Sequence, residues 1–359
     1  MSNCCTSFRG HPSRLRLPSK RYQCRERIVD HSVDDDAFDH LALVAFECFV
    51  TKIKIGIDDS STFDASSLVF YCREPSCGVL VDDECAAQKP DDGAMDPSFF
   101  DPGYTLAGKT GFQIWPGSRL VVEALTVPQQ SIDTDKLRHW QERIASSSVS
   151  LRVLEVGAGV GMVGISLASA GAQVLLTDLT TLVTESLVPN LERNSTASGD
   201  EMQHPPGWMT DYLPSIHHDD IDSTQNIVRQ IGPGWAATAA LDWTQPLEDQ
   251  LSEEQLQVDL IVASDCVWLS SMLQALISTV EAVFKVSKRS PKLLMSFQRR
   301  DPDKLESTTS NMFTTVDGII NELQARKWAV DCLAWHPVAY NEGGKQNLSK
   351  EVFLLEISP

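Results

Sequence analysis

The sequence contains no apolar run of the ~18–20 residues with which a helix crosses a bilayer, so it predicts a water-soluble protein without a membrane partner. Positive charge is scarce, because 30 Lys and Arg stand against 49 Asp and Glu, for a net charge of −19. A chain this acidic repels nucleic-acid phosphates, which argues against DNA or RNA as a partner. The same charge would attract a basic protein surface.

Regular cysteine spacing is also missing. The nine cysteines are an odd number, and no signal-peptide segment precedes them, which favours reduced thiols in a cytoplasmic protein. Cys72, Cys77 and Cys85 lie close together but lack a fourth ligand and the two-residue spacing of a zinc site. We therefore expect packing residues there and no metal centre.

The start of the chain is basic, unlike the rest of it. Residues 1–25 hold six basic residues and no acidic residue, and three aspartates follow at 34–36. Such a start resembles an organelle transit peptide. It lacks an amphipathic apolar face, however. We therefore favour a disordered cytoplasmic tail over residues 1–36, with organelle targeting by residues 1–25 as the alternative.

The remaining sequence predicts two kinds of structure. Short β-branched stretches between 37 and 104, such as 67–72 and 78–81, predict a small β-rich N-terminal extension. From Leu151 onward strands alternate with helices, which is typical of an α/β fold with a parallel sheet. The expected strands are 151–156, 173–177, 236–241, 258–264, 292–297, 328–335 and 352–357. The expected helices are 162–170, 181–194, 270–286 and 312–326.

One polar segment interrupts this alternation. Residues 195–234 are rich in Pro and Gly, and 40 residues is long for a connection inside a compact domain. We therefore expect an insertion at 195–234, within a domain that covers residues 105–359.

A glycine-rich stretch, EVGAGVGMVG from Glu155 to Gly164, joins the first expected strand of this domain to the helix after it. Backbone N–H groups at such a turn face a ligand, and glycines let the ligand approach. Gly159 to Gly164 read as G-x-G-x-x-G, the dinucleotide fingerprint. Glu155 to Gly161 read as E-x-G-x-G-x-G, a pattern that fits S-adenosylmethionine (AdoMet). The loop by itself leaves both ligands open.

Acidic residues follow three of the expected strands. Ligands of open parallel sheets bind beyond the carboxyl ends of the strands, so we expect Asp178, Asp242 and Asp265 to converge on one crevice. Asp178 follows Gly157 by 21 residues, which suits a carboxylate that binds ribose hydroxyls, and an exposed loop carboxylate is the alternative.

Two features favour AdoMet over a dinucleotide. A carboxylate at Glu155 suits a ligand with an ammonium group and repels a pyrophosphate. Trp243, next to Asp242, offers a flat face for an adenine ring, although a plain core position explains that tryptophan equally well.

Several motifs together are more specific than the loop. They are GFQIWPG from Gly111, VLEVGAGVG from Val153, TD from Thr177, NLERN from Asn190, LDW from Leu241 and ASDCVW from Ala263. With these motifs, residues 105–359 resemble the class I, seven-β-strand AdoMet methyltransferases, and within them the protein-lysine methyltransferases of the methyltransferase-like 21 type. The resemblance implies a Rossmann-like seven-stranded sheet, mostly parallel, that ends in an antiparallel C-terminal hairpin.

The resemblance also implies roles for individual residues. The implied cofactor-binding residues are Trp115, Glu155, Gly157, Ala158, Gly159, Asp178, Leu179, Asp242, Trp243 and Ala263. The implied catalytic residues, where the target lysine enters, are Asp265 and Trp268. The family has Asp-x-x-Tyr at this motif, so Trp268 keeps an aromatic wall and lacks the phenol oxygen.

The function implied is AdoMet-dependent methyl transfer to a lysine side chain of a protein substrate in the cytoplasm. A nucleotide-dependent oxidoreductase of Rossmann type is one alternative, although the sequence has no obvious Tyr-x-x-x-Lys for hydride transfer. The other alternative is a catalytically silent AdoMet-binding scaffold, which the tryptophan at position 268 suggests.

Overall fold

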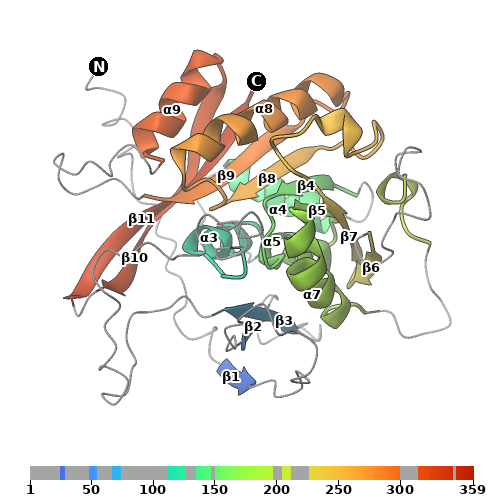
Figure 1. Cartoon of the computed structure of the whole chain (residues 1–359), viewed down its shortest axis with the longest axis horizontal. Helices are drawn as coiled ribbons and strands as arrows, with labels where there is room; N and C mark the ends of the chain where they lie inside the picture. The colour runs from blue at the N-terminus through green and yellow to red at the C-terminus, as the bar shows by residue number, and fades with distance from the viewer. Residues whose placement is uncertain are drawn as a thin grey trace, which may run out of the picture.

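The computed structural model describes residues 25–28, 48–54, 67–73, 111–126, 135–146, 150–196, 204–211, 226–299, 314–342 and 345–359. They form one large mixed sheet with helices on both faces and one small antiparallel sheet (Figure 1). None of the helices in these ranges combines the length and the apolar character that crossing a membrane requires. The strand candidate 78–81 lies outside the described residues.

The large sheet has eight strands in the order β10-β11-β9-β8-β4-β5-β7-β6. Its parallel strands are β4 (Arg152–Val156), β5 (Gln173–Asp178), β7 (Gly234–Ala240), β8 (Leu260–Ser264) and β9 (Lys292–Gln298). Its antiparallel strands are β6 (Val228–Ile231), β10 (Ala329–Glu342) and β11 (Lys345–Ser358). The α/β fold, with a mostly parallel sheet and an antiparallel C-terminal hairpin, is confirmed.

The sheet has one strand more than the seven expected. The additional strand, β6, comes from the end of the 195–234 stretch, where Ile231 pairs with Gly234 across a tight turn. Gly232 takes φ +57° in that turn, a backbone conformation that glycine adopts without strain. The Gly-Pro-Gly sequence that suggested an insertion is therefore, at this point, a hairpin turn.

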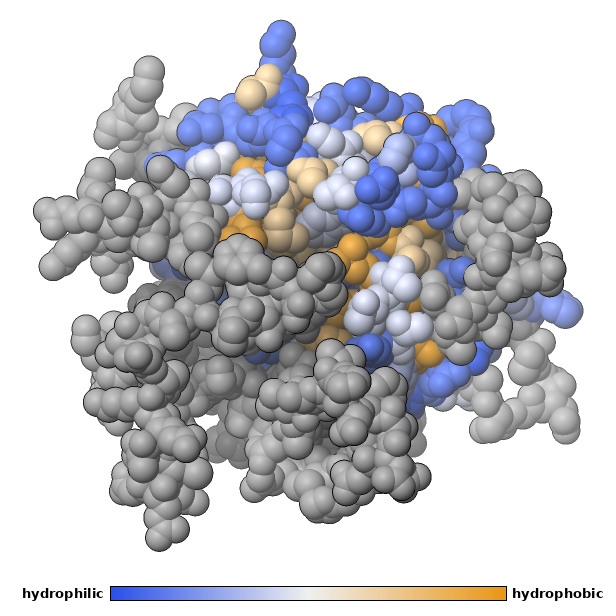
Figure 2. Space-filling model, viewed as in Figure 1, coloured by the Kyte–Doolittle hydropathy of each residue, from blue (hydrophilic) through white to orange (hydrophobic). Residues whose placement is uncertain are grey.

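Alternation along the central strands divides the core in two. Successive side chains of a strand point to opposite faces, so Val153 packs under α3 and α5, whereas Leu154 packs under α8. Helices α3 (Pro116–Thr126), α4 (Asp135–Ala145) and α5 (Met162–Ser169) contribute to the first cluster, and α8 (Ser270–Val286) and α9 (Val316–Ala325) to the second. Figure 1 shows α8 and α9 on one side of the sheet and α3 and α5 on the other. Figure 2, in the same view, shows hydrophilic residues toward the outside of the described surface and hydrophobic residues toward its middle.

Helix α4 was not among the expected helices, although its signal is present. Leu137, Trp140 and Ile144 are its buried residues and have the spacing of one helix face. The indole N–H of Trp140 donates to Glu356 of β11 at 2.7 Å, and this buried carboxylate also accepts from Lys292. Helix α4 is thereby attached to β11, the second strand from one edge of the sheet.

The expected helix 181–194 consists of three pieces: α6 (Thr180–Leu182), a π-helical turn η2 (Val183–Leu187) and α7 (Val188–Arg193). Pro189 lies just beyond the wide turn. A proline inside a helix has no N–H to donate and collides with the carbonyl four residues before it, and the wide turn relieves both problems.

The C-terminal hairpin is longer than expected. The expected strands end at 335 and begin again at 352, whereas β10 continues to Glu342 and β11 begins at Lys345. Strand β11 pairs with β9 only from Val352 to Ile357, so beyond that point the hairpin is a two-stranded ribbon.

The small sheet has the order β1-β2-β3, with β1 (Arg25–Ile28), β2 (Cys48–Lys54) and β3 (Ser67–Arg73). Strand β1 lies within 1–36, where the sequence predicts a disordered tail; it pairs with β2 over four residues. The side chains of Leu68, Phe70 and Cys72 on β3 are buried in the same cluster as α3 and α5. The division of the chain at 36 and 104 stays a prediction.

We predict that Gly164→Ala destabilises the fold. A Cβ at this position of α5 would lie 2.5 Å from Oε2 of Glu155 and 2.7 Å from the side chain of Leu176, so either these buried side chains or the helix must shift. Overpacking of this kind lowers the free energy of unfolding by about 1–3 kcal/mol, measured by thermal or denaturant unfolding. Gly207→Ala is the matched control, because nothing lies within 4 Å of its added Cβ. Equal unfolding midpoints for the two variants would contradict the close helix–sheet contact.

Candidate active site

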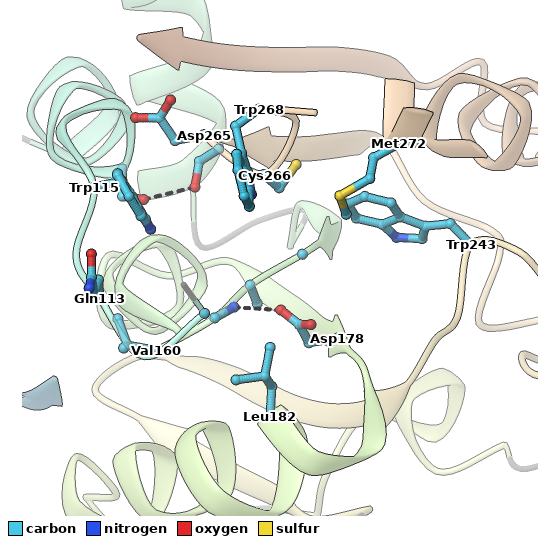
Figure 3. Close-up of a pocket in the computed structure, with 16 residues that line it drawn as sticks. Gln113, Trp115, Val160, Asp178, Leu182, Trp243, Asp265, Cys266, Trp268 and Met272 are labelled. Carbon is cyan, nitrogen blue, oxygen red and sulfur yellow. Dashed lines mark hydrogen bonds between the residues drawn. The ribbon is translucent and has the colours of Figure 1, made fainter. Parts of the chain in front are cut away.

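A cavity opens where the central parallel strands end, and Figure 3 shows its walls. Its volume is about 580 Å³, including the part that is open to solvent. The cavity is lined by Gly111, Gln113, Trp115, Ser118, Gly157, Ala158, Gly159, Val160, Asp178, Leu182, Trp243, Ser264, Asp265, Cys266, Trp268 and Met272. It thus lies at the carboxyl ends of β4, β5, β7 and β8, the place where open parallel sheets bind ligands.

The glycine loop after β4 is packed too closely for side chains. Gly157 and Gly159 have φ +70° and +57°. A Cβ on Gly157 would lie 2.7 Å from the Cβ of Cys266, and one on Gly159 would lie 2.7 Å from the carbonyl oxygen of Gly111. Glycine is required at both positions by backbone conformation and by space. The loop therefore leaves a cradle of bare backbone at the floor of the cavity.

Asp178, at the end of β5, holds this loop. One carboxylate oxygen accepts from the N–H of Gly159 at 2.8 Å and the other from the N–H of Leu179 at 2.8 Å (Figure 3 draws the first). Burial raises the pKa of Asp178 to about 6, against the two backbone hydrogen bonds, which lower it. The side chain also lines the cavity, so its remaining lone pairs are available to a ligand. Leu179 does not line the cavity and contributes its backbone N–H to Asp178.

Glu155 is placed differently from what its motif suggested. Its carboxyl group lies behind the loop, where Oε2 accepts from the N–H of Gly164 in α5 at 2.8 Å, and it does not line the cavity. Burial raises the pKa of Glu155 to about 8, the negative charge of Asp178 adds to this, and the hydrogen bond from Gly164 opposes it. At neutral pH the group is mostly protonated, so it carries little of the charge that a ligand ammonium would need.

Asp265 joins two elements at the top of the cavity. Its Oδ2 accepts from the N–H of Gly117 at the start of α3, and its Oδ1 accepts from the N–H of Gln298 at the end of β9, both at 2.7 Å. The residue is buried and has φ +50°. Apart from glycine, it is short polar residues such as Asp that adopt this left-handed backbone conformation most readily. Asp265 therefore fixes the start of α3, and Trp115 directly before that helix, relative to β8.

Aromatic rings form much of the wall. Trp115 and Trp268 face the cavity from the side of α3 and of the segment after β8, and Trp243 lies beside Met272 (Figure 3). Asp242 does not line the cavity; its Oδ1 accepts from the N–H and the hydroxyl of Thr244 and so shapes the turn that carries Trp243. The crevice thus contains two of the three strand-end acids.

Eight of the twelve expected site residues line the cavity, and four do not. The expected residues that line the cavity are Trp115, Gly157, Ala158, Gly159, Asp178, Trp243, Asp265 and Trp268. Those that do not are Glu155, Leu179, Asp242 and Ala263, the last of which is fully buried in β8. Lining residues that were not singled out are Gly111, Gln113, Ser118, Val160, Leu182, Ser264, Cys266 and Met272. Most of these belong to the quoted motifs, whereas Leu182 and Met272 come from helix starts that carry no motif.

Comparison with solved structures finds methyltransferases at low identity. The magnesium protoporphyrin IX methyltransferase of Synechocystis PCC 6803, solved with SAH, is 15% identical, with a TM-score of 0.33 over 58% of this chain and 75% of that one. The ribosomal protein L11 methylase of Lactobacillus delbrueckii subsp. bulgaricus is 13% identical, with a TM-score of 0.31 over 66% and 75%. Likeness at this level carries no conclusion about substrates.

Comparison with families is more direct. No curated protein sequence matches the chain. A family model described as lysine methyltransferase matches residues 104–223 and 224–317, which together are more than half of the 359 residues and contain every motif quoted above. The chain therefore belongs to the lysine methyltransferase family and is a methyltransferase that uses AdoMet.

Proposed function

We propose that the protein methylates the side-chain amine of a lysine in a protein substrate. The observation that carries this proposal is the wall of the cavity, where Trp115 and Trp268 face the space above the glycine cradle and Asp265 is the acid beside them. Aromatic faces attract methylated ammonium groups, which are the products of lysine methylation.

The residues at the floor fit AdoMet. Bare backbone at Gly157 and Gly159 forms a cradle that a Cβ would fill. We assign Asp178 to the ribose hydroxyls and Trp243 to the adenine ring, with Ala158 beside the cradle. Leu179 and Asp242 act through them, because the N–H of Leu179 binds Asp178 and the side chain of Asp242 shapes the turn of Trp243. Glu155 binds the N–H of Gly164 in α5 behind the loop, and Ala263 is a buried residue of β8. When bound, AdoMet supplies a methyl group on a positively charged sulfonium.

Methyl transfer requires the neutral form of the substrate lysine's amine, so the residues at the entrance of the cavity must favour that form. A free lysine has a pKa of ~10.4, and removal from water lowers that value. Tryptophan walls exclude water around the amine. A carboxylate favours the charged amine, but both oxygens of Asp265 already accept backbone N–H groups, which offsets part of its negative charge. Asp265 therefore orients the amine without holding it strongly in the protonated form, and Trp268 closes the wall.

The acceptor is a basic protein region, because the chain has a net charge of −19. The same charge disfavours nucleic acids as acceptors. Cysteines without regular spacing support a cytoplasmic location.

Labelling of a lysate tests the acceptor. Purified protein with methyl-labelled AdoMet should label proteins, and hydrolysis should release the label as methylated lysine. Gly157→Val is the negative control, because its side chain would enter the cradle against Cys266 and Trp243. Label on nucleic acid, on small molecules or on other amino acids would refute the proposal. AdoMet binding without any transfer would support the silent scaffold instead.

The affinity for AdoMet should depend on pH through Asp178. The ionised carboxylate accepts hydroxyl hydrogen bonds, and its pKa of about 6 means that it is largely protonated at pH 5. We expect the Kd for AdoMet, measured by calorimetry, to rise about tenfold from pH 7 to pH 5. Asp178→Asn should bind about 1.5–3 kcal/mol more weakly at pH 7 and lose this pH dependence.

Asp242→Asn is the matched control for that experiment, because Asp242 also follows a strand but does not line the cavity. It should keep the pH dependence of the wild-type protein. The same slope in Asp178→Asn as in the wild type would remove Asp178 from the ribose site.

A further inference from the structure

Two buried asparagines lie four residues apart, Asn190 within helix α7 and Asn194 at its C-cap. That spacing places them on one face of the helix. Both belong to the NLERN motif, yet neither lines the cavity. Buried amides are expensive unless they are hydrogen-bonded, so what they bind indicates what they do.

Asn190 binds the glycine loop. Its side-chain Nδ2 donates to the carbonyl oxygen of Val160 at 3.0 Å. Val160 lies between Gly159 and Gly161 and lines the cavity. Gly161 has φ +78° directly after it, so this hydrogen bond fixes the direction of the backbone where the loop turns into α5.

Asn194 binds strand β3 of the small sheet. Its Oδ1 accepts from the N–H of Val69, and its Nδ2 donates to the carbonyl of the same residue, each at 2.8 Å. Within an antiparallel sheet, one residue exchanges such a pair of bonds with its partner on the next strand. Strand β3 is the edge of the order β1-β2-β3, so the amide of Asn194 takes the place of the next strand there.

The two asparagines are also bound to each other. Nδ2 of Asn194 donates to the backbone carbonyl of Asn190 at 2.8 Å. A continuous set of hydrogen bonds therefore runs from Val69 through both asparagines to Val160. Helix α7 has six residues and follows a π-helical turn, so its position is set by such contacts rather than by its own stability.

We propose that Asn190 and Asn194 are positioning residues that couple the docking of the N-terminal sheet to the shape of the AdoMet-binding loop. Loss of β3 leaves the amide of Asn194 without its partners and releases α7, and the loop then loses the hydrogen bond to Val160. Because coupling between two sites is reciprocal, AdoMet binding in turn stabilises β3 on the body of the protein.

Hydrogen exchange of the full-length protein with and without AdoMet tests the coupling. We expect AdoMet to slow exchange of the peptide that contains residues 67–73 in the wild-type protein. Asn190→Ala should abolish this effect, because it removes the bond to Val160 and leaves the backbone contacts of Asn194. Exchange of β3 that is unchanged by AdoMet in the wild type would overturn the proposal.

Calorimetry tests the reverse direction. Asn194→Leu should raise the Kd for AdoMet about three- to tenfold although position 194 is outside the cavity, and Asn194→Asp, which keeps only the acceptor for Val69, should fall between it and wild type. Glu192→Gln is the control, because Glu192 is an exposed residue of α7 that pairs with Arg229. This variant should bind AdoMet with the Kd of the wild-type protein. A folded Asn194→Leu protein with wild-type affinity would refute the coupling. Neither measurement involves the methyl acceptor, so both stand apart from the lysine proposal.

Discussion

Close approach of backbones at the glycine loop is the constraint on which the site depends. Segments from residues 111–117, 155–161 and 264–268, which are far apart in the sequence, meet there with no room for a side chain between them. The carbonyl of Gly111 lies against Gly159, and Cys266 lies against Gly157. The same proximity brings Trp115 and Trp268 onto one cavity, because each follows closely after one of these contacts. A site for a cofactor and an aromatic entrance thus arise from the same packing.

Buried carboxyl groups hold these segments in place, each by accepting backbone N–H groups. Asp178 binds the loop to β5, Glu155 binds α5 to β4, and Asp265 binds α3 to β9. Backbone N–H groups at helix starts and strand ends have no partner within their own element, so an acid at a strand end satisfies them at a fixed distance. These three carboxyl groups therefore hold neighbouring segments at fixed distances, and of the three only Asp178 and Asp265 also line the cavity.

Much of this arrangement follows from local patterns in the sequence, and the rest depends on tertiary contacts. The central strands, the glycine loop and the position of Asp178 were predictable because each has a local pattern: a short apolar run, closely spaced glycines, and an acid directly after a strand. The orientation of Glu155 follows from strand alternation, because it shares a face of β4 with Val153 under α5. The E-x-G-x-G-x-G motif instead suggested that Glu155 contacts the ligand. Strand β6 was missed because it has only four residues, three of them half-buried, and so lacks an apolar pattern.

The wide turn at Val183–Leu187 has a consequence for the register of the helix after it. An α-helix advances by about 100° per residue, and one π-helical turn takes up about one extra residue. If the same residues wound as a regular α-helix without the wide turn, the face that carries Asn190 and Asn194 would be rotated by about 100°, and their amides would point away from Val160 and Val69. By taking up one residue, the wide turn therefore keeps the helix after it in register with both the glycine loop and the N-terminal sheet.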